Sequence, residues 1–409
     1  MQTKSILVLT PYYLPGFKAG GPIRAISGVA EALGSEFQFK IICGDRDLGD
    51  DKPFDNEPIG VWYNYGQAKV LRLAPGLKGV RKLFDVMRSE DYDIVYLNSI
   101  WAYSYSCLPI LWRRLGLLPR KPTVISPRGE LSEGALSLKP FRKKLYLNLG
   151  KRAKIFERVI WQASSGGEKA DILRVLGQPG ILQATAANVG NHEGLGYAGR
   201  SITIATDVAA ILESDAGCSH EPKTPGDLRV VTLGRVCRMK NIEYAITLFQ
   251  HIRGRVTYDI YGPLEDKLYV AKCQRACAKL PENVTVRFMG GIPQDRVLKT
   301  LGRYHIFLLP TLGENFGHVM IEALNSGCAL VISDRTPWIN LEEAGVGWAI
   351  PLSAPERFVR SLETALTWSD EDFVLFSEKA RMYAADHELY QVALRENRML
   401  FHSVTDFDD

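Results

Sequence analysis

Short apolar runs rich in β-branched residues alternate with helix-period segments along the whole chain. Nine such runs predict strands buried on both faces, over residues 5–9, 39–43, 94–97, 123–126, 229–233, 257–261, 285–288, 305–309 and 329–333. Helices are expected between them, for example over 241–251, 267–279, 295–301 and 316–326. This alternation is typical of parallel sheets with helices on both faces, which bind ligands at the carboxyl ends of their strands.

The pattern begins twice, which indicates two domains. The first series spans residues 1–212, a polar segment over 213–227 is typical of a linker, and a second series covers 228–386. Residues 387–409 predict a terminal helix and a short tail. The predicted fold class is therefore α/β, with two doubly wound Rossmann-like domains that face each other across a cleft.

Composition excludes several classes of protein. Of the 409 residues, 46% are hydrophobic and 23% are charged, which excludes collagen, coiled coil and wholesale disorder. No apolar run is long enough for a membrane span, and Pro11 ends an N-terminal stretch too short for a signal peptide, so we expect a cytoplasmic protein. The seven cysteines lack zinc-ligand spacing, and no motif indicates a metal or another cofactor.

The strongest candidate for chemistry follows the predicted strand 305–309. A loop with Gly313, Glu314 and Asn315 leads through Phe316, Gly317 and His318 into a helix that carries Glu322. The amide groups at the start of such a helix suit a diphosphate, and a carboxylate beside it suits sugar hydroxyls. Either glutamate alone is better explained as a solvated helix charge, but the combination with Gly313, Gly317 and Gly327 favours a binding site.

Two further segments follow strand ends. Gly234, Arg235 and Lys240 come after the predicted strand 229–233, where two cations would neutralise a diphosphate. Gly20 and Gly21 follow the first strand and would let backbone approach a ligand. Neither segment has the glycine spacing of a dinucleotide-binding site, so binding of NAD is poorly supported.

In this order the motifs resemble glycosyltransferase family 4, a group of retaining GT-B enzymes that use nucleotide-sugar donors. The similar segments are the glutamate pair within GENFGHVMIEAL (313–324), Gly234-Arg235 with Lys240-Asn241, Tyr261-Gly262-Pro263 with Tyr269, Gly20-Gly21, Ser126-Pro127-Arg128-Gly129 with Ala135-Leu136, and Gly345-Val346-Gly347-Trp348. The resemblance spans nearly the whole chain.

The resemblance implies roles for these residues. Arg235 and Lys240 would bind the donor diphosphate, Glu322 the ribose and Glu314 the transferred sugar. Donor-binding backbone is implied at Gly234, Gly262 and residues 315–318, and Gly20 and Gly21 would approach the phosphates and the acceptor. The terminal helix is implied to cross back onto the first domain.

The chain departs from the family at two histidine positions, and the usual NG-V-D string after the first domain is degraded to Ala205-Thr206-Asp207-Val208. Many members carry histidine where this chain has Arg128, and often where it has Asn98. Arg128 stays protonated and cannot act as a base, so the group that orients the sugar is left open. Both residues are candidates for contacts with the acceptor.

Charge is distributed unevenly. Residues 1–210 hold 28 Lys and Arg against 19 Asp and Glu, although the net charge of the chain is only +4. Much of this excess lies within residues 139–158, where basic side chains alternate with apolar ones at helical spacing, including Arg142, Lys143, Lys144, Lys151 and Arg152. A basic amphipathic helix indicates an anionic membrane surface, and a solvated helix face is the alternative. No motif for nucleic acid accompanies the charge.

The sequence therefore predicts a metal-independent, retaining glycosyltransferase. Its partners would be a UDP- or GDP-sugar donor and a saccharide acceptor, attached to polyprenyl diphosphate in surface polysaccharide assembly. Two alternatives stay open: a GT-B sugar-nucleotide epimerase, and a non-catalytic scaffold of a polysaccharide-assembly complex.

Overall fold

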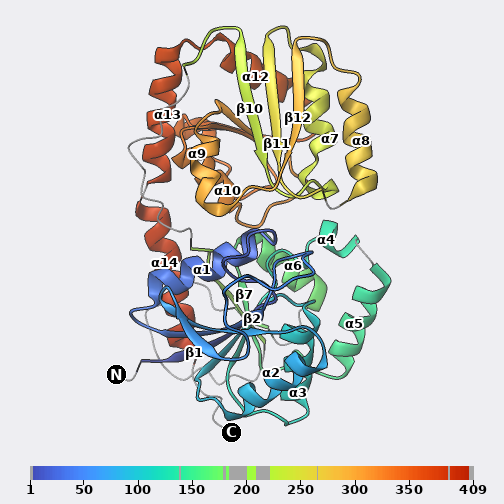
Figure 1. Cartoon of the computed structure of the whole chain (residues 1–409), viewed down its shortest axis with the longest axis vertical. Coiled ribbons are helices and arrows are strands. Elements are labelled where there is room, and N and C mark those ends of the chain that lie inside the picture. Colours follow the sequence, from blue (N-terminus) through green and yellow to red (C-terminus); the bar gives the residue numbers. More distant parts are fainter. Residues whose placement is uncertain are drawn as a thin grey trace. The chain divides into compact units, whose positions relative to one another are not determined.

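The structure is a computed structural model, and it describes residues 3–137, 140–177, 181–183, 200–208, 222–264, 266–385 and 387–404. The chain divides into two compact units (Figure 1). The N-terminal unit holds residues 1–210 together with 388–409, and the C-terminal unit holds residues 211–387. Most of the expected linker 213–227 lies outside the described residues.

A nine-stranded sheet forms the centre of the N-terminal unit. Its order is β3-β4-β2-β1-β5-β6-β7-β9-β8, and every neighbouring pair is parallel except β3 with β4. The strands are β1 (Ser5–Leu9), β2 (Gln38–Gly44), β3 (Trp62–Tyr65), β4 (Ala68–Leu73), β5 (Ile94–Asn98), β6 (Thr123–Ser126), β7 (Ile160–Ala163), β8 (Ile181–Gln183) and β9 (Arg200–Ile204).

Helices cover both faces of this sheet (Figure 1). They are α1 (Gly21–Leu33), α2 (Leu77–Ser89), α3 (Leu108–Arg114), α4 (Glu133–Ser137), α5 (Pro140–Arg152), α6 (Gly166–Leu176) and α14 (His387–Ser403), with a π-helical turn over Tyr103–Cys107. One hydrophobic core joins the sheet to α1 and α14, and the core on the other face joins it to α2, α3, α5 and α6. Successive residues of β1 contribute to opposite cores, which explains why its sequence is apolar throughout.

The last helix, α14, packs on the N-terminal unit although it follows the whole C-terminal unit in sequence. The Phe401 ring lies between Phe37, Phe39 and Tyr96, at centroid distances of 5.6, 6.0 and 5.5 Å. The Lys4 ammonium donates hydrogen bonds to three carbonyl oxygens at the end of the helix. The hydrophobic core that buries these rings also contains Ile6 and Val8 of β1, so α14 and the first strand are packed in the same core.

The C-terminal unit has a fully parallel sheet of six strands in the order β12-β11-β10-β13-β14-β15. The strands are β10 (Asp227–Leu233), β11 (Arg255–Tyr261), β12 (Val284–Gly290), β13 (Ile306–Leu309), β14 (Ala329–Ser333) and β15 (Gly347–Ile350). This order is that of a doubly wound Rossmann-like sheet, whose direction of winding reverses between β10 and β13. Ligands of such sheets bind at the carboxyl ends of the strands on either side of that reversal.

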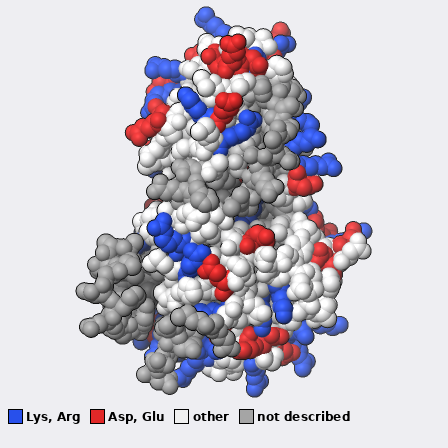
Figure 2. All heavy atoms as spheres, turned by 90° about the vertical axis from the view of Figure 1, so that its left-hand side faces the viewer, with Lys and Arg blue, Asp and Glu red and all other residues white. Residues whose placement is uncertain are grey.

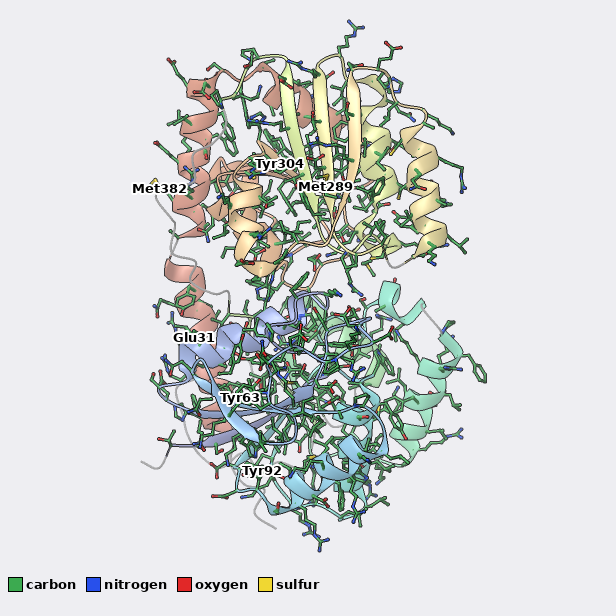
Figure 3. All side chains as sticks on the ribbon, in the orientation of Figure 1. Glu31, Tyr63, Tyr92, Met289, Tyr304 and Met382 are labelled. Atoms are coloured by element: carbon green, nitrogen blue, oxygen red, sulfur yellow. The ribbon has the colours of Figure 1, made fainter. Side chains whose placement is uncertain are left out.

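Helices also flank this sheet on both faces. They are α7 (Ile242–Thr247), α8 (Lys267–Cys277), α9 (Val297–Leu301), α10 (His318–Asn325), α11 (Leu341–Ala344), α12 (Pro355–Thr367) and α13 (Asp370–Ala384), with 3₁₀ turns over Arg238–Lys240, Leu248–His251 and Gln294–Arg296. One core contains α7, α8 and α12, and the other contains α9, α10, α11 and α13. Among the polar groups inside the unit, Asp259 accepts hydrogen bonds from Arg287 and from Tyr304, the tyrosine labelled in Figure 3.

The expected α/β class with two Rossmann-like sheets is confirmed, and all nine predicted strands are present. The expectation that each is buried on both faces is wrong for β12, which lies at the edge of its sheet and exposes alternate residues. Six further strands, β3, β4, β7, β8, β9 and β15, were not predicted. The edge strand β3 lacks a run of apolar side chains, because three of its residues are half-buried and Asn64 is exposed. Among the described residues, no helix combines the length and the apolar character needed to cross a membrane.

Candidate functional site

The carboxyl ends of β10 and β11 approach each other so closely that only glycine fits. A Cβ atom on Gly262 would lie 1.9 Å from the carbonyl oxygen of Gly234, and Gly262 has a φ of +145°. The amide of Gly234 donates to the carbonyl of Tyr261 at 2.9 Å, and the amide of Gly262 donates to that of Gly290 at 2.8 Å. These contacts fix where the segment after β10 leaves the sheet.

That segment carries the predicted cations. Arg235 and Arg238 are exposed, and Lys240 ends the 3₁₀ turn Arg238–Lys240 with its side chain folded past Gly234. The Lys240 ammonium forms an ion pair with the carboxylate of Glu314, which lies on the loop after β13. Both side chains are mostly buried, with 16% and 18% of their surface exposed. The structure thus brings together two residues that are 74 positions apart in the chain.

Backbone contacts hold the two loops side by side. The amide of Leu312 donates to the carbonyl of Met239 at 2.8 Å, and the Thr311 hydroxyl donates to the same oxygen at 2.9 Å. From the other side, the amide of Glu314 donates to the carbonyl of Arg335 at 2.9 Å. The Lys240–Glu314 pair therefore rests on a fixed frame at the switch between β10 and β13.

Helix α10 begins at His318, two residues later than expected, because Gly317 forms its cap in the left-handed conformation with φ +80°. A Cβ atom at Gly317 would lie 3.1 Å from the Glu314 side chain. The indole of Trp338 donates to the carbonyl of Phe316 at 2.6 Å, and the Phe316 ring lies 4.7 Å from the His318 ring. The first amides of α10 thus follow directly after the loop that carries Glu314 and Asn315.

Glu322 lies one turn into α10 and is almost fully buried. Its carboxylate accepts a hydrogen bond of 3.0 Å from the side-chain amide of Gln294, in the 3₁₀ turn after β12. Gln294 was not predicted as a site residue, because a single glutamine in a polar loop carries no signal in the sequence. The contact brings the segment after β12 to the same edge of the sheet.

The arrangement combines two kinds of chemistry at one edge of the C-terminal sheet. Cationic side chains and helix amides can neutralise a bound diphosphate, whereas the two carboxylates can accept hydrogen bonds from hydroxyl groups. Among the described residues, no group of three or more His, Cys, Asp or Glu side chains is placed to hold a metal ion.

In the N-terminal unit, Gly20 and Gly21 lie at the start of α1, after β1. Gly20 caps the helix with φ +71°, and no atom lies within 4 Å of the position its Cβ would take. The buried carboxylate of Asp47 accepts hydrogen bonds from the amides of Phe17 at 2.8 Å and Lys18 at 3.0 Å. Asp47 therefore holds the glycine loop in place, a role that the sequence analysis missed.

The structure places Asn98 and Arg128 in one buried network at the ends of β5 and β6. The Arg128 guanidinium forms an ion pair with Asp207 and donates to the Asn98 side-chain oxygen at 2.9 Å and to the Tyr96 hydroxyl at 2.7 Å. Only 5% of the Arg128 side chain is exposed. Its guanidinium is thus bonded to groups inside the unit. It connects β5, through Tyr96 and Asn98, to Asp207 in the segment after β9.

The loop after β5 is held in a strained conformation next to this network. Ser99 has a φ of +125° and Arg128 a φ of +54°, values that residues other than glycine rarely adopt. The Glu130 carboxylate accepts hydrogen bonds from the Ser99 hydroxyl at 2.9 Å and from the amide of Ile100 at 2.7 Å. Burial raises the pKa of Glu130 despite these hydrogen bonds. Strained backbone of this kind is concentrated at functional sites.

The predicted basic helix forms as α5, but two of its cations do not face outward. The Lys143 ammonium donates to the carbonyl of Ala135 at 2.6 Å and lies 5.3 Å from the centre of the Trp101 ring. The Lys151 ammonium donates to the carbonyl of Val175. Each of these two lysines is thus used to attach α5 to the unit, in contrast to the outward orientation expected of the basic patch. Arg142, Lys144 and Arg152 are exposed as expected.

Comparison with families of known proteins finds a match in the C-terminal half of the chain. Residues 219–382, which contain the site in the C-terminal unit, match the family model of glycosyl transferases group 1. Among curated proteins, no sequence matches this chain significantly.

Solved structures of similar fold extend over nearly the whole chain. Sucrose-phosphate synthase from Thermosynechococcus elongatus is 17% identical, with a TM-score of 0.67 over 98% of this chain and 100% of its own. The Anabaena protein HepE, in complex with UDP and glucose, is 14% identical, with a TM-score of 0.63 over 98% and 99% of the two chains. WaaG, a glycosyltransferase involved in lipopolysaccharide biosynthesis, is 13% identical, with a TM-score of 0.62 over 97% and 99%. This chain therefore has the GT-B fold, and its residues 219–382 match glycosyl transferases group 1.

Proposed function

We propose that the protein is a retaining glycosyltransferase that moves a sugar from a nucleotide-sugar donor to a hydroxyl group of a saccharide acceptor. The observation that carries this proposal is the Lys240–Glu314 ion pair beside the start of α10, within the segment that matches glycosyl transferases group 1. In this proposal Lys240 would neutralise the leaving group and Glu314 would contact the sugar, and the ion pair supports it by holding the two side chains next to each other.

The donor would bind at the carboxyl edge of the C-terminal sheet. Arg235, Lys240 and the first amides of α10 would hold the diphosphate, and Glu322, oriented by Gln294, would accept hydrogen bonds from the ribose hydroxyls. Glu314 would then contact the transferred sugar. A UDP- or GDP-sugar is the proposed donor class, and UDP and glucose bound to HepE support the former.

The reaction breaks the bond between the sugar C1 and the diphosphate oxygen. The acceptor hydroxyl attacks the same face of the sugar, and its proton passes to the leaving diphosphate. Negative charge therefore grows on the diphosphate in the transition state, where Lys240 and Arg235 stabilise it. The negative charge of the leaving group is therefore neutralised by protein side chains.

The acceptor would be bound by the N-terminal unit, near Gly20, Gly21, Asn98 and the loop after β5. We propose a saccharide linked to polyprenyl diphosphate, used in surface polysaccharide assembly at the inner face of the membrane. The basic character of the N-terminal half supports an anionic acceptor. The role of the structurally similar WaaG in lipopolysaccharide biosynthesis supports the same class.

The test is a thermal shift screen of the full chain against a panel of UDP- and GDP-sugars, with the free nucleotides as controls. A ligand at a hundred times its Kd stabilises the folded state by about 2.7 kcal/mol, which is a measurable rise in Tm. One donor should raise the Tm of the protein, and should raise that of the Lys240→Ala variant less. No shift with any donor would contradict the proposal and favour a scaffold, and conversion of the donor without an acceptor would indicate an epimerase.

A further inference from the structure

Helix α5 is attached to the N-terminal unit by one face. Leu147 and Gly150 are buried, and the Tyr146 ring packs against Trp101 and Phe156 at centroid distances of 5.5 and 5.9 Å. Together with the inward-turned Lys143 and Lys151, these contacts fix which side of the helix is exposed.

The opposite face of α5 exposes an apolar stripe. Phe141, Leu145 and Leu149 are spaced four residues apart, so they lie along one side of the helix. Their exposed fractions are 79%, 48% and 54%. Single exposed apolar residues are common, but three large ones in a row on one helix face mark an interaction surface.

Basic side chains flank this stripe. Arg142 and Lys144 are exposed on either side of Phe141, and Arg152 extends the stripe at the end of the helix. Helix α5 contains five Lys or Arg and no Asp or Glu. Elsewhere on the molecule, the face drawn in Figure 2 carries basic and acidic side chains interspersed with one another.

We propose that this stripe docks the protein on an anionic lipid bilayer. Phe141, Leu145 and Leu149 would enter the boundary between headgroups and acyl chains, while Arg142, Lys144 and Arg152 contact lipid phosphates. A second copy of the chain fits the surface less well, because a symmetric contact would place these cations against their own counterparts.

The stripe is coupled to the edge of the sheet where the acceptor is proposed to bind. Lys143 lies against Trp101, which follows three residues after the end of β5, and the Trp101 indole donates to the carbonyl of Glu130 at 3.3 Å. Docking through α5 would thus hold the loop after β5 near the lipid surface, where a lipid-linked saccharide is found. This last consequence rests on the proposed function, whereas the docking surface itself does not.

The test is co-sedimentation of the full chain with vesicles of phosphatidylcholine, with and without phosphatidylglycerol. The wild type should bind only the anionic vesicles. The triple variant Phe141→Ser, Leu145→Ser, Leu149→Ser should bind at least about tenfold more weakly, because the apolar anchor is lost. Arg142→Gln with Lys144→Gln should also weaken binding, and raised salt should have less effect on that variant than on the wild type.

Matched controls separate the stripe from general hydrophobicity and charge. Leu375→Ser with Met382→Ser removes two exposed apolar side chains from α13, where Met382 projects outward (Figure 3). Lys78→Gln with Lys82→Gln removes two exposed cations from α2. Neither control should change vesicle binding, and every variant should keep the Tm of the wild type.

The proposal is overturned if the wild type does not bind anionic vesicles, or if the triple variant binds them as well as the wild type. It is also overturned if light scattering shows that the wild type is a dimer and the triple variant is a monomer. The stripe would then be a contact between two copies of the chain. None of these measurements uses a sugar donor, so a failure here is distinct from a failure of the proposed transferase activity.

Discussion

Lys240 and Glu314 form an ion pair that links the loops after β10 and β13 at the point where the C-terminal sheet reverses its winding. The backbone of both loops is fixed by hydrogen bonds, so the pair is held in position before any ligand arrives. In the proposed reaction each partner serves a different part of the donor.

Lys240→Ala should lower kcat by at least about a hundredfold, because the variant lacks the cation that stabilises charge on the leaving diphosphate. Some loss of Tm is also expected, because the mostly buried Glu314 is left without its cation, so rates are compared only for protein shown to be folded. Steady-state rates with the donor found by thermal shift would measure the effect. Lys272→Ala, which breaks the exposed pair with Glu243, is the matched control and should leave kcat unchanged. Normal turnover by a folded Lys240→Ala protein would refute the assignment.

Gln294→Ala should weaken donor binding about fivefold, because one neutral-to-charged hydrogen bond no longer orients Glu322. The effect should appear in the Kd of the donor or in KM, with kcat nearly constant, since Gln294 positions a binding residue. Isothermal titration with the nucleotide would measure it. Gln274→Ala, an exposed glutamine on α8, is the control. A change in kcat alone would contradict a positioning role.

Gly262→Ala should destabilise the C-terminal unit by about 3 kcal/mol, because the new Cβ meets the Gly234 carbonyl and the ends of β10 and β11 must separate. Gly226→Ala is a useful comparison, since Gly226 also has a positive φ, +83°, but has open space around it. That variant should lose only about 1 kcal/mol from backbone strain. Denaturant unfolding of both proteins tests this, and equal losses would show that the close approach is unimportant.

Asp207→Asn should destabilise the N-terminal unit by about 3–5 kcal/mol, because Arg128 is left as an uncompensated buried charge. The exposed pair between Arg398 and Glu36 gives the contrast, and Arg398→Gln should cost less than about 1 kcal/mol. Thermal unfolding would measure both. If Asp207→Asn were as stable as the wild type, the Arg128 network would not be structural.

Glu130→Gln should become more stable relative to the wild type as pH rises. Burial raises the pKa of the Glu130 carboxyl above its ordinary 4.5, so the folded state favours the protonated form. The stability contributed by that preference is present at low pH and is lost as pH rises through the raised pKa. The neutral amide avoids this loss while it can still bond to Ser99 and Ile100. Tm values of both proteins from about pH 5 to about pH 8 test the prediction, and a constant difference would contradict it.

The sequence by itself determined the fold class and most of the site in the C-terminal unit. The strands are apolar on both faces because helices cover both sides of each sheet, and this pattern is local enough to recognise. Gly317, Glu314 and Glu322 belong to one strand–loop–helix segment, so their spacing alone placed them near one another.

Only the tertiary structure decided contacts between segments far apart in the chain. The pairing of Lys240 with Glu314, of Gln294 with Glu322 and of Arg128 with Asp207 depends on which strands become neighbours, and no local pattern encodes that order. The same is true of α5. Its sequence shows a basic amphipathic helix, but packing against Trp101 decided that Lys143 turns inward and that Phe141, Leu145 and Leu149 stay exposed. Burial of one helix face requires a partner surface, and only the folded chain supplies it.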